Sequence, residues 1–146
     1  MLIPIVKFSV EGVPVGKGRP KFARRGNFVQ AYTPTKTKTY EQQVADAARV
    51  AMGSKLRTME PVQVNLDMYL PIPASWSKLK RQLAQKGVVY PTTKPDIDNV
   101  AKAVFDAMNG IVFQDDKQIV NQMVTKRYSD NPRVEARIYE VSYDEK

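Results

Sequence analysis

One acidic segment, residues 94–116, constrains this chain more than any other stretch. It reads KPDIDNVAKAVFDAMNGIVFQDD, and it carries one pair of acids near each end: Asp96 with Asp98, and Asp115 with Asp116. Pro95 disfavours helical backbone at the residue before it, so the chain should enter this segment extended. In an extended segment, residues two apart point to the same side. We therefore expect Asp96 and Asp98 to direct both carboxylates to one point.

A helix from about residue 100 to residue 108 is predicted between the two acidic pairs. Asp98 or Asn99 is suited to the N-cap position, where a side-chain oxygen accepts a hydrogen bond from the first turn. Asn109-Gly110 supplies the residues that tolerate left-handed backbone at a helix end. The segment thus reads as two acids, a helix, a turn and two further acids.

This layout predicts that carboxylates and one lysine converge. Lys102 follows Asp98 by four residues, about one helical turn, and the chain can fold back after Gly110 to bring Asp115 or Asp116 to the same place. Three carboxylates at one point repel each other unless a cation lies between them. Oxygen ligands of this kind suit hard divalent cations, Mg²⁺ above all. The chain has no His and no Cys, which excludes Ser-His-Asp and Cys-His catalysis, the usual zinc sites and disulfides.

A simpler interpretation competes with the metal site. An Asp-x-Asp-Asn sequence before a helix is often a cap with a spare surface acid. Lys102 and Asp106 have the spacing of an ordinary exposed ion pair. The second acidic pair favours a site, because it gathers acids in one segment of a chain that is otherwise basic.

The composition points to a polyanionic partner. The chain has 146 residues with 23 Lys and Arg against 15 Asp and Glu, a formal charge of +8. This length fits one domain with an ordinary core, and the charge favours nucleic acid. No apolar run is long enough to cross a membrane, and the first residues lack the features of a signal peptide. We expect a cytoplasmic protein with no membrane contact.

A basic, Gly-rich segment at residues 12–34 is the candidate nucleic-acid contact. Its glycines and prolines predict a long loop or an irregular hairpin. It contains five cations within nine residues and no acid, namely Lys17, Arg19, Lys21, Arg24 and Arg25, with Phe22, Phe28 and Tyr32 interleaved. Cations contact phosphates and aromatic rings stack on unpaired bases. The alternative is a solvated loop whose aromatic side chains fold back on the core.

The remaining patterns predict an α+β fold. Alternation predicts strands at 2–10, 62–70 and from 134 to about 143, with a less regular strand at 118–127. Helices are expected from about Pro34 to Met52, capped by Thr33, and from a cap at Ser75 to about Lys86, with Leu79 facing inward. We expect one domain, residues 1–146, with helices packed on a mixed β-sheet. The basic helix at 75–86 is interpreted as a solvated face.

The acidic segment resembles the RusA family of Holliday junction resolvases. The resemblance rests on Asp96-Ile97-Asp98-Asn99, Lys102, Phe105-Asp106-Ala107 and Asp115-Asp116-Lys117-Gln118. It extends more loosely to Gly16-Lys17-Gly18-Arg19-Pro20 and Tyr32-Thr33-Pro34. The resemblance places the family's essential acids on Asp96, Asp98 and Asp116, and its essential lysine on Lys102. Pro95 stands where some members have arginine, which makes Lys94 the neighbouring basic contact.

The resemblance implies a small homodimeric endodeoxyribonuclease, often of prophage origin, that resolves four-way DNA junctions by paired nicks in recombination and repair. Its cofactor would be Mg²⁺, one or two ions held by Asp96, Asp98 and Asp116, with Mn²⁺ as a substitute. Asp115 is a further candidate acid. Two rivals remain at this point. One is a non-catalytic DNA-binding accessory protein whose acids are caps, and the other is a Mg²⁺-dependent nuclease that acts on flaps or single strands.

Overall fold

The central strand β4 (Val62–Pro71) organises the structure, a computed structural model that describes residues 3–32 and 34–141. Every second residue of β4 is buried, from Val62 to Leu70, while the residues between them are half-buried. β4 pairs in parallel with β5 (Ile119–Ser129) and antiparallel with β6 (Arg133–Glu140). β1 (Val6–Glu11) pairs with the other side of β6, which gives the order β1-β6-β4-β5. This mixed sheet confirms the predicted α+β class.

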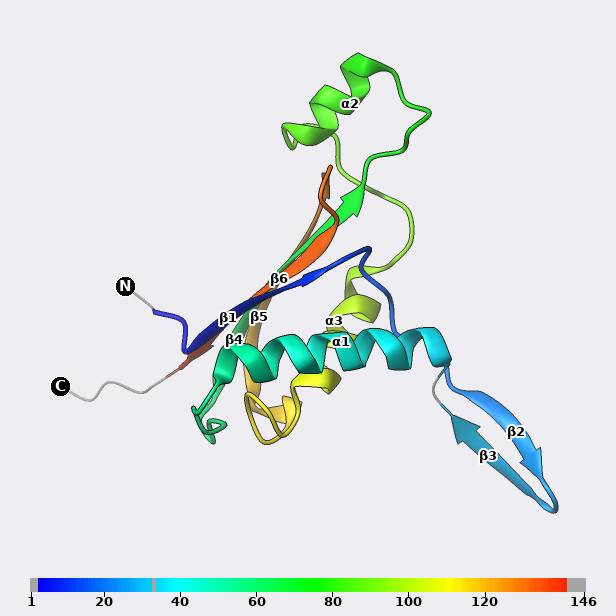
Figure 1. Ribbon diagram of the computed structural model, residues 1–146, viewed down its shortest axis with the longest axis vertical. Coiled ribbons are helices and arrows are strands. Elements are labelled where there is room, and N and C mark those ends of the chain that lie inside the picture. The colour runs from blue at the N-terminus through cyan, green and yellow to red at the C-terminus, as the bar shows by residue number, and fades with distance from the viewer. Residues whose placement is uncertain (1–2, 33, 142–146) are drawn as a thin grey trace.

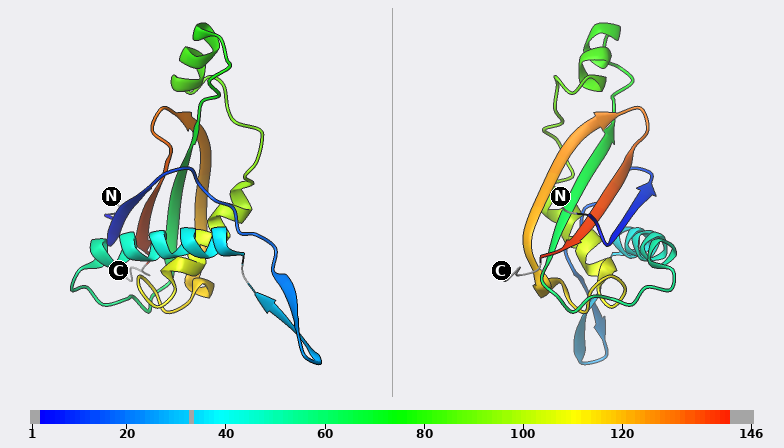
Figure 2. Two further views of the ribbon diagram at one scale, coloured as in Figure 1. Left: turned by 45° about the vertical axis from the view of Figure 1, so that its right-hand side comes forward. Right: turned by 90° about the vertical axis from the view of Figure 1, so that its left-hand side faces the viewer.

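Two helices cover one face of the sheet (Figures 1 and 2). They are α1 (Thr35–Met52) and α3 (Ile97–Met108), and their buried residues join those of β4 and β6 in one core. The predicted α1 face is confirmed, since Tyr40, Val44 and Ala48 are buried. The helix starts one residue later than predicted, with Pro34 at the N-cap position. The expected cap, Thr33, lies outside the described residues.

The helix α3 lies in the connection between the parallel strands β4 and β5, as parallel pairing requires a crossover. It begins at Ile97, three residues earlier than predicted, and Asp96 is its N-cap. The prediction of Asp98 or Asn99 as the cap is therefore wrong. Asp96, Asp98 and Asn99 are all residues that can cap a helix, and the local sequence does not indicate which of them does so.

The second half of the basic segment forms a regular hairpin, so of the two predicted options the hairpin is found there, while residues 12–20 form a loop. Strands β2 (Lys21–Arg25) and β3 (Phe28–Tyr32) pair antiparallel around Gly26-Asn27. Gly26 has a φ of 60°, the left-handed backbone that tight hairpin turns require at this position. The hairpin projects away from the sheet and helices (Figure 1). Phe22 and Phe28 are 70% and 77% exposed, so these aromatic side chains do not fold back on the core.

A second projection carries the short helix α2 (Lys78–Gln85) at the opposite end of the molecule (Figure 1). Ser77 caps it, accepting a hydrogen bond from the Lys80 N–H at 3.2 Å. The predicted cap, Ser75, is therefore wrong by two residues. Leu79 is 67% exposed, which contradicts its predicted inward position. No described helix of this chain combines the length and apolarity that a membrane span needs.

Candidate active site

The first turn of α3 holds the first acidic pair, and both acids are exposed. Asp96 has extended backbone, but Asp98 is already helical. Successive helical residues are rotated by about 100°, so residues two apart in a helix do not share a face. The extended geometry predicted for this pair is therefore wrong. Asp96 makes no capping hydrogen bond with its side chain, so its carboxylate is not used in holding the helix end.

The second acidic pair divides into a structural acid and an acid that faces the site. Asp115 is the N-cap of the short 3-10 helix η1 (Asp116–Gln118), and its Oδ1 accepts a hydrogen bond from the Lys117 N–H at 2.9 Å. Gln118 completes the cap, because its Oε1 accepts from the Asp115 N–H at 3.0 Å. The same side chain donates through Nε2 to the carbonyl oxygens of Thr58 and Glu60. The Asp-Asp-x-Gln sequence thus builds a fixed turn that leaves Asp116 free of the cap.

Lys102 lies between two carboxylates, one from its own helix and one from η1. Its Nζ is 3.0 Å from Asp106 Oδ1 and 3.3 Å from Asp116 Oδ2. The hydrogen bond to Asp106, followed by smaller contributions that include Asp116, raises the pKa of the Lys102 ammonium. Burial and the neighbouring Asp115 raise the pKa of the Asp116 carboxyl, although Lys102 opposes this. A further cation beside Asp116 would favour the ionised form of this carboxyl.

Lys17 extends this cluster to α1. Its Nζ is 2.8 Å from Glu41 Oε1 and 2.9 Å from Asp106 Oδ2, and all three side chains are partly buried. Burial opposes ionisation of Asp106, but the hydrogen bonds from Lys17 and Lys102 outweigh it and hold the pKa of this carboxyl below its usual range. The result is a continuous charge chain, which runs from Glu41 through Lys17, Asp106 and Lys102 to Asp116. The predicted DNA-contacting ammonium of Lys17 is thus engaged inside the protein.

The loop that carries Lys17 is clamped between the two helices. The Lys17 N–H donates to the Asn99 carbonyl at 2.9 Å, and the Gly18 N–H donates to Thr37 Oγ1 at 2.9 Å. A Cβ on Gly18 would lie 2.9 Å from Pro34 Cγ, which is closer than real Cβ contacts. Residues 16–18, named here the GKG strap, therefore fix the start of α3 against the start of α1.

Removing the hydroxyl of Thr37 should loosen the strap. Thr37 is only 2% exposed, so Thr37→Val leaves the Gly18 N–H without its partner in a buried place. We expect a loss of about 1–3 kcal/mol in the free energy of unfolding. The matched control is Thr39→Val on the exposed face of the same helix, which should change stability by no more than about 0.5 kcal/mol. Chemical denaturation of the three proteins measures both values, and equal stability of the two variants would contradict the assigned role of Thr37.

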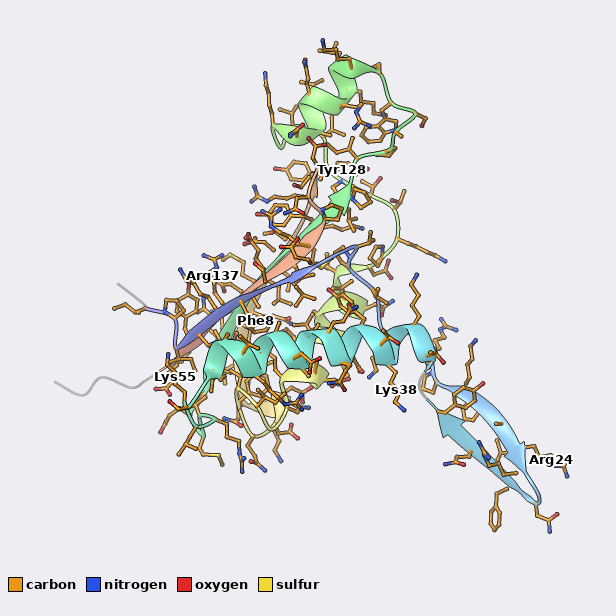
Figure 3. The ribbon with its side chains drawn as sticks, viewed as in Figure 1. Phe8, Arg24, Lys38, Lys55, Tyr128 and Arg137 are labelled. Atoms are coloured by element: carbon orange, nitrogen blue, oxygen red, sulfur yellow. The ribbon has the colours of Figure 1, made fainter. Side chains whose placement is uncertain are left out.

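A hollow at the start of α3 places basic groups next to the first acid. It is lined by the GKG strap together with Lys94, Pro95, Asp96 and Asn99. Lys94 and the strap thus share this hollow with Asp96. The other predicted DNA-contacting cations, Arg19, Lys21, Arg24 and Arg25, lie on or beside the hairpin, and Arg24 is near its tip (Figure 3).

The acids fit a hard divalent cation in their chemistry. Asp96, Asp98 and Asp116 offer carboxylate oxygens, and a chain without His or Cys has no softer side-chain ligand of the usual kinds. Among residues 3–32 and 34–141, however, no three acidic side chains are gathered closely enough to hold a metal. Asp116 contacts Lys102 in this arrangement. The structure thus joins Lys102 to Asp116, and it does not gather all three predicted acids into one cluster.

Two members of the charge chain were not among the site residues predicted from the sequence. Asp106 lies four residues after Lys102, and that spacing was visible but matched an ordinary surface pair. Glu41 gave no signal, because it is 24 residues from Lys17 and the two meet only through the packing of the GKG strap on α1. Both carboxylates position lysines and neither is part of the predicted metal set.

Comparisons with known proteins identify the family. The sequence profile described as "Endodeoxyribonuclease RusA" matches residues 11–139. The chain is also 43% identical to "Uncharacterized protein YqaN" of Bacillus subtilis (strain 168) over 139 residues, which cover 94% of this chain and 97% of that protein. The profile spans the strap, the hairpin, the acidic segment, strands β4 and β5 and almost all of β6. The chain belongs to the RusA family of endodeoxyribonucleases.

Proposed function

We propose that this protein is a divalent-metal-dependent, structure-selective endonuclease that resolves four-way DNA junctions by paired nicks. The observation that supports the proposal is the position of Lys102, whose ammonium pairs with the carboxylates of Asp106 and Asp116. A lysine fixed between carboxylates, within one helical turn of Asp98, suits phosphodiester hydrolysis. The membership in an endodeoxyribonuclease family supports the reaction class.

Three acids would hold the cation, and Mg²⁺ is the expected ion with Mn²⁺ as a substitute. These are Asp96, Asp98 and Asp116. When bound, such an ion supplies positive charge to the transferring phosphoryl oxygens and lowers the pKa of the attacking water. One ion or two would satisfy this proposal. Asp115 is assigned to the turn, because its carboxylate caps η1.

The chain's own residues position and stabilise the reacting phosphate. The Lys102 ammonium stabilises negative charge that develops on the phosphoryl oxygens in the transition state. Asp106 keeps that ammonium in place, and Lys17 keeps Asp106 in place from the side of α1. Glu41 and Asp106 together neutralise Lys17, so the strap is not repelled by Lys102. Substrate would reach the site along the hollow that Lys94 lines.

A panel of DNA structures tests the substrate class. Purified protein is offered a synthetic four-way junction, a flap, a single strand and a linear duplex, each with Mg²⁺ or with chelator. We expect metal-dependent cleavage of the junction in clear preference to the others. Binding without cleavage under every condition would favour an accessory protein, and preferred cleavage of the flap or the single strand would favour a different nuclease.

The hairpin should supply phosphate contacts to the bound junction. Its three cations Lys21, Arg24 and Arg25 are exposed, and its aromatic side chains lie among them. Removing one lysine or arginine from a phosphate lowers the slope of log K against log salt by roughly 0.9 on duplex DNA. Replacing the three with Gln should therefore weaken binding and reduce the magnitude of the slope of log K against log salt by up to about 2.7. A titration of junction binding against salt measures the slope, and an unchanged slope would assign the hairpin no phosphate contact.

The working unit is proposed to be a symmetric homodimer. One chain contributes one such site, and resolving a junction takes two cuts in strands related by its twofold axis. A C₂ dimer sets two identical sites in that relation. Mixing wild-type protein with excess Asp98→Asn subunits should shift the products from paired cuts to single nicks. Paired cuts at an undiminished ratio, or one monomer per junction by light scattering, would contradict the dimer.

A further inference from the structure

Two long stretches of the chain contain no acid, and they account for its net positive charge. These are residues 12–40 and 68–95, which hold 12 of the 23 Lys and Arg and none of the 15 Asp and Glu. The rest of the chain therefore carries 11 cations against 15 acids and is net negative. The positive charge is a property of two segments and not of the surface in general. The first stretch contains the hairpin discussed above, and the second has no assigned role.

The second stretch forms a projection of its own. Figures 1 and 2 show α2 at one end of the molecule and the β2–β3 hairpin at the other, with α3 between them. The chain that leaves α2 runs directly into the start of α3, where Asp96 and Asp98 lie. Residues 72–94, named here the α2 arm, thus begin at the end of β4 and finish beside the candidate site.

The cations of the α2 arm have no carboxylate partner among the described residues. There are five in the stretch, namely Lys78, Lys80, Arg81, Lys86 and Lys94, and none takes part in an ion pair of residues 3–32 and 34–141. On the body of the protein Lys102, Arg133 and Arg137 pair with acids, whereas Lys7, Arg57 and Arg127 take part in no ion pair of the described residues. The arm differs from the body in that it contains cations and no acid. Arg81 donates to the Pro73 carbonyl, and the Lys80 ammonium lies 3.9 Å from the centre of the Trp76 ring. The arm thus presents positive charge that the protein does not neutralise.

Two of these cations are placed against the preference of their own helix. Lys78 and Lys80 lie in the first turn of α2, whereas Lys86 is its C-cap. The N-terminus of a helix carries positive partial charge and favours acids in the first turn. The C-terminus carries negative partial charge and favours cations in the last turn. The stability of α2 therefore does not account for Lys78 and Lys80, whereas an external anion does.

The arm is fixed to the sheet well enough to present those charges in a defined place. The rings of Trp76 and Tyr128 meet edge to face with centroids 5.1 Å apart, so the arm is attached at the end of β5, where Figure 3 shows Tyr128. Ile72 and Ala84 are buried. Gly87 has a φ of 80°, and its N–H and that of Val88 bond back to the last carbonyls of α2. That closing motif ends the helix at a fixed point.

We propose that the α2 arm is a second DNA-binding surface, which contacts backbone phosphates on the side of the cut site opposite the hairpin. The inference rests on the proposed function, because it assigns the arm to the same DNA that enters the site. Lysine ammonium groups act as point charges toward phosphate oxygens and need no base sequence. Leu79, Val88 and Tyr90 are exposed on the same arm, so a protein partner is the competing occupant. The five cations of the arm, in a stretch without any acid, favour DNA.

Binding measured in chelator tests the arm without any cleavage. The arm variant replaces Lys78, Lys80 and Lys86 with Gln. The matched control replaces Lys7, Arg49 and Arg57 with Gln, a change of equal charge at exposed positions outside both acid-free stretches. The arm variant should lower the salt slope of junction binding by about 0.9 for each of its three lysines that touches a phosphate. An equal effect in both variants, or an unchanged slope in the arm variant, would overturn the proposal.

A cross-link locates the contact directly. The chain has no cysteine, so Gln85→Cys provides one attachment point for a photo-reactive probe on α2. Leu56→Cys, 91% exposed and next to Lys55 at the far end of α1 (Figure 3), is the control. We expect the α2 probe to cross-link to junction DNA and the control probe not to do so. Cross-linking to a second protein chain in place of DNA would overturn the proposal, as would equal cross-linking from both positions. If DNA cross-links form but wild-type protein with Mg²⁺ cleaves no junction, the proposed function fails while the arm contact stands.

Discussion

Asp98→Asn should abolish junction cleavage while leaving junction binding intact, and Asp96→Asn and Asp116→Asn should behave alike. Each change removes a carboxylate charge from the proposed metal set with almost no change in shape. Losing a metal ligand removes several kcal/mol of transition-state stabilisation, so the rate should fall roughly 10³-fold or more. Binding should be equal or tighter, because a negative charge beside the phosphates is gone. Cleavage and binding assays at matched protein concentrations measure the two effects.

Two control variants make that result specific to the site. Asp130→Asn changes an exposed acid in the turn between β5 and β6 and should leave cleavage unchanged. Asp115→Asn weakens the cap of η1, so it should lower the stability of the protein. Its effect on the cleavage rate should be much smaller than that of Asp116→Asn. Near-normal cleavage by Asp98→Asn would remove this residue from the site. Equal effects of the Asp115 and Asp116 variants would contradict the division of roles within the pair.

Lys102→Ala should slow the chemical step by more than it weakens binding. A charge aimed at developing negative charge acts mainly in the transition state, and the loss of one such donor costs roughly 10²–10³-fold in rate. Single-turnover cleavage at saturating protein isolates this step. Lys7→Ala, on an exposed position of β1, is the control for the loss of one positive charge.

The neighbours of Lys102 refine this prediction. Asp106→Asn keeps the shape of the side chain but removes the charge that bonds both Lys17 and Lys102. It should lower the single-turnover rate less than Lys102→Ala does, because it displaces the ammonium without removing it. An unchanged rate with weaker binding in Lys102→Ala would make this lysine a phosphate anchor with no part in the chemical step.

Periodic patterns predicted the body of this fold well because burial imposes them directly. Strand β4 alternates from Val62 to Leu70 since one of its faces packs on α1 and α3. The helix starts were predicted less well. Ser77 caps α2 where Ser75 was expected, and Asp96 begins α3 where Asp98 or Asn99 was expected. When neighbouring residues cap equally well, the packing of the whole chain decides which one becomes the cap. A short stretch of sequence does not contain that information.

In the candidate site, too, contacts between residues close in sequence were predicted better than contacts between distant residues. The Asp-Asp-x-Gln turn is local, and its residues satisfy one another within η1, apart from the Gln118 bonds to the loop after α1. The pairing of Lys17 with Glu41 and Asp106 joins three elements far apart in the sequence. Sequence reasoning therefore placed Lys17 on DNA, because a cation within a basic run gives no sign of a distant carboxylate. The hairpin was foreseen only as one of two options, since its Gly and Pro content also fits a loop.

The most direct measurement of the central claim maps the cuts on an end-labelled four-way junction. The protein is mixed with the junction in Mg²⁺ or in chelator, and each of the four strands is labelled in turn. We expect nicks in two strands related by the junction's twofold axis, only when Mg²⁺ is present, and we expect Asp98→Asn to produce none. Cuts that persist in chelator, cuts confined to one strand in the wild type, or an intact junction in Mg²⁺ would contradict the central claim.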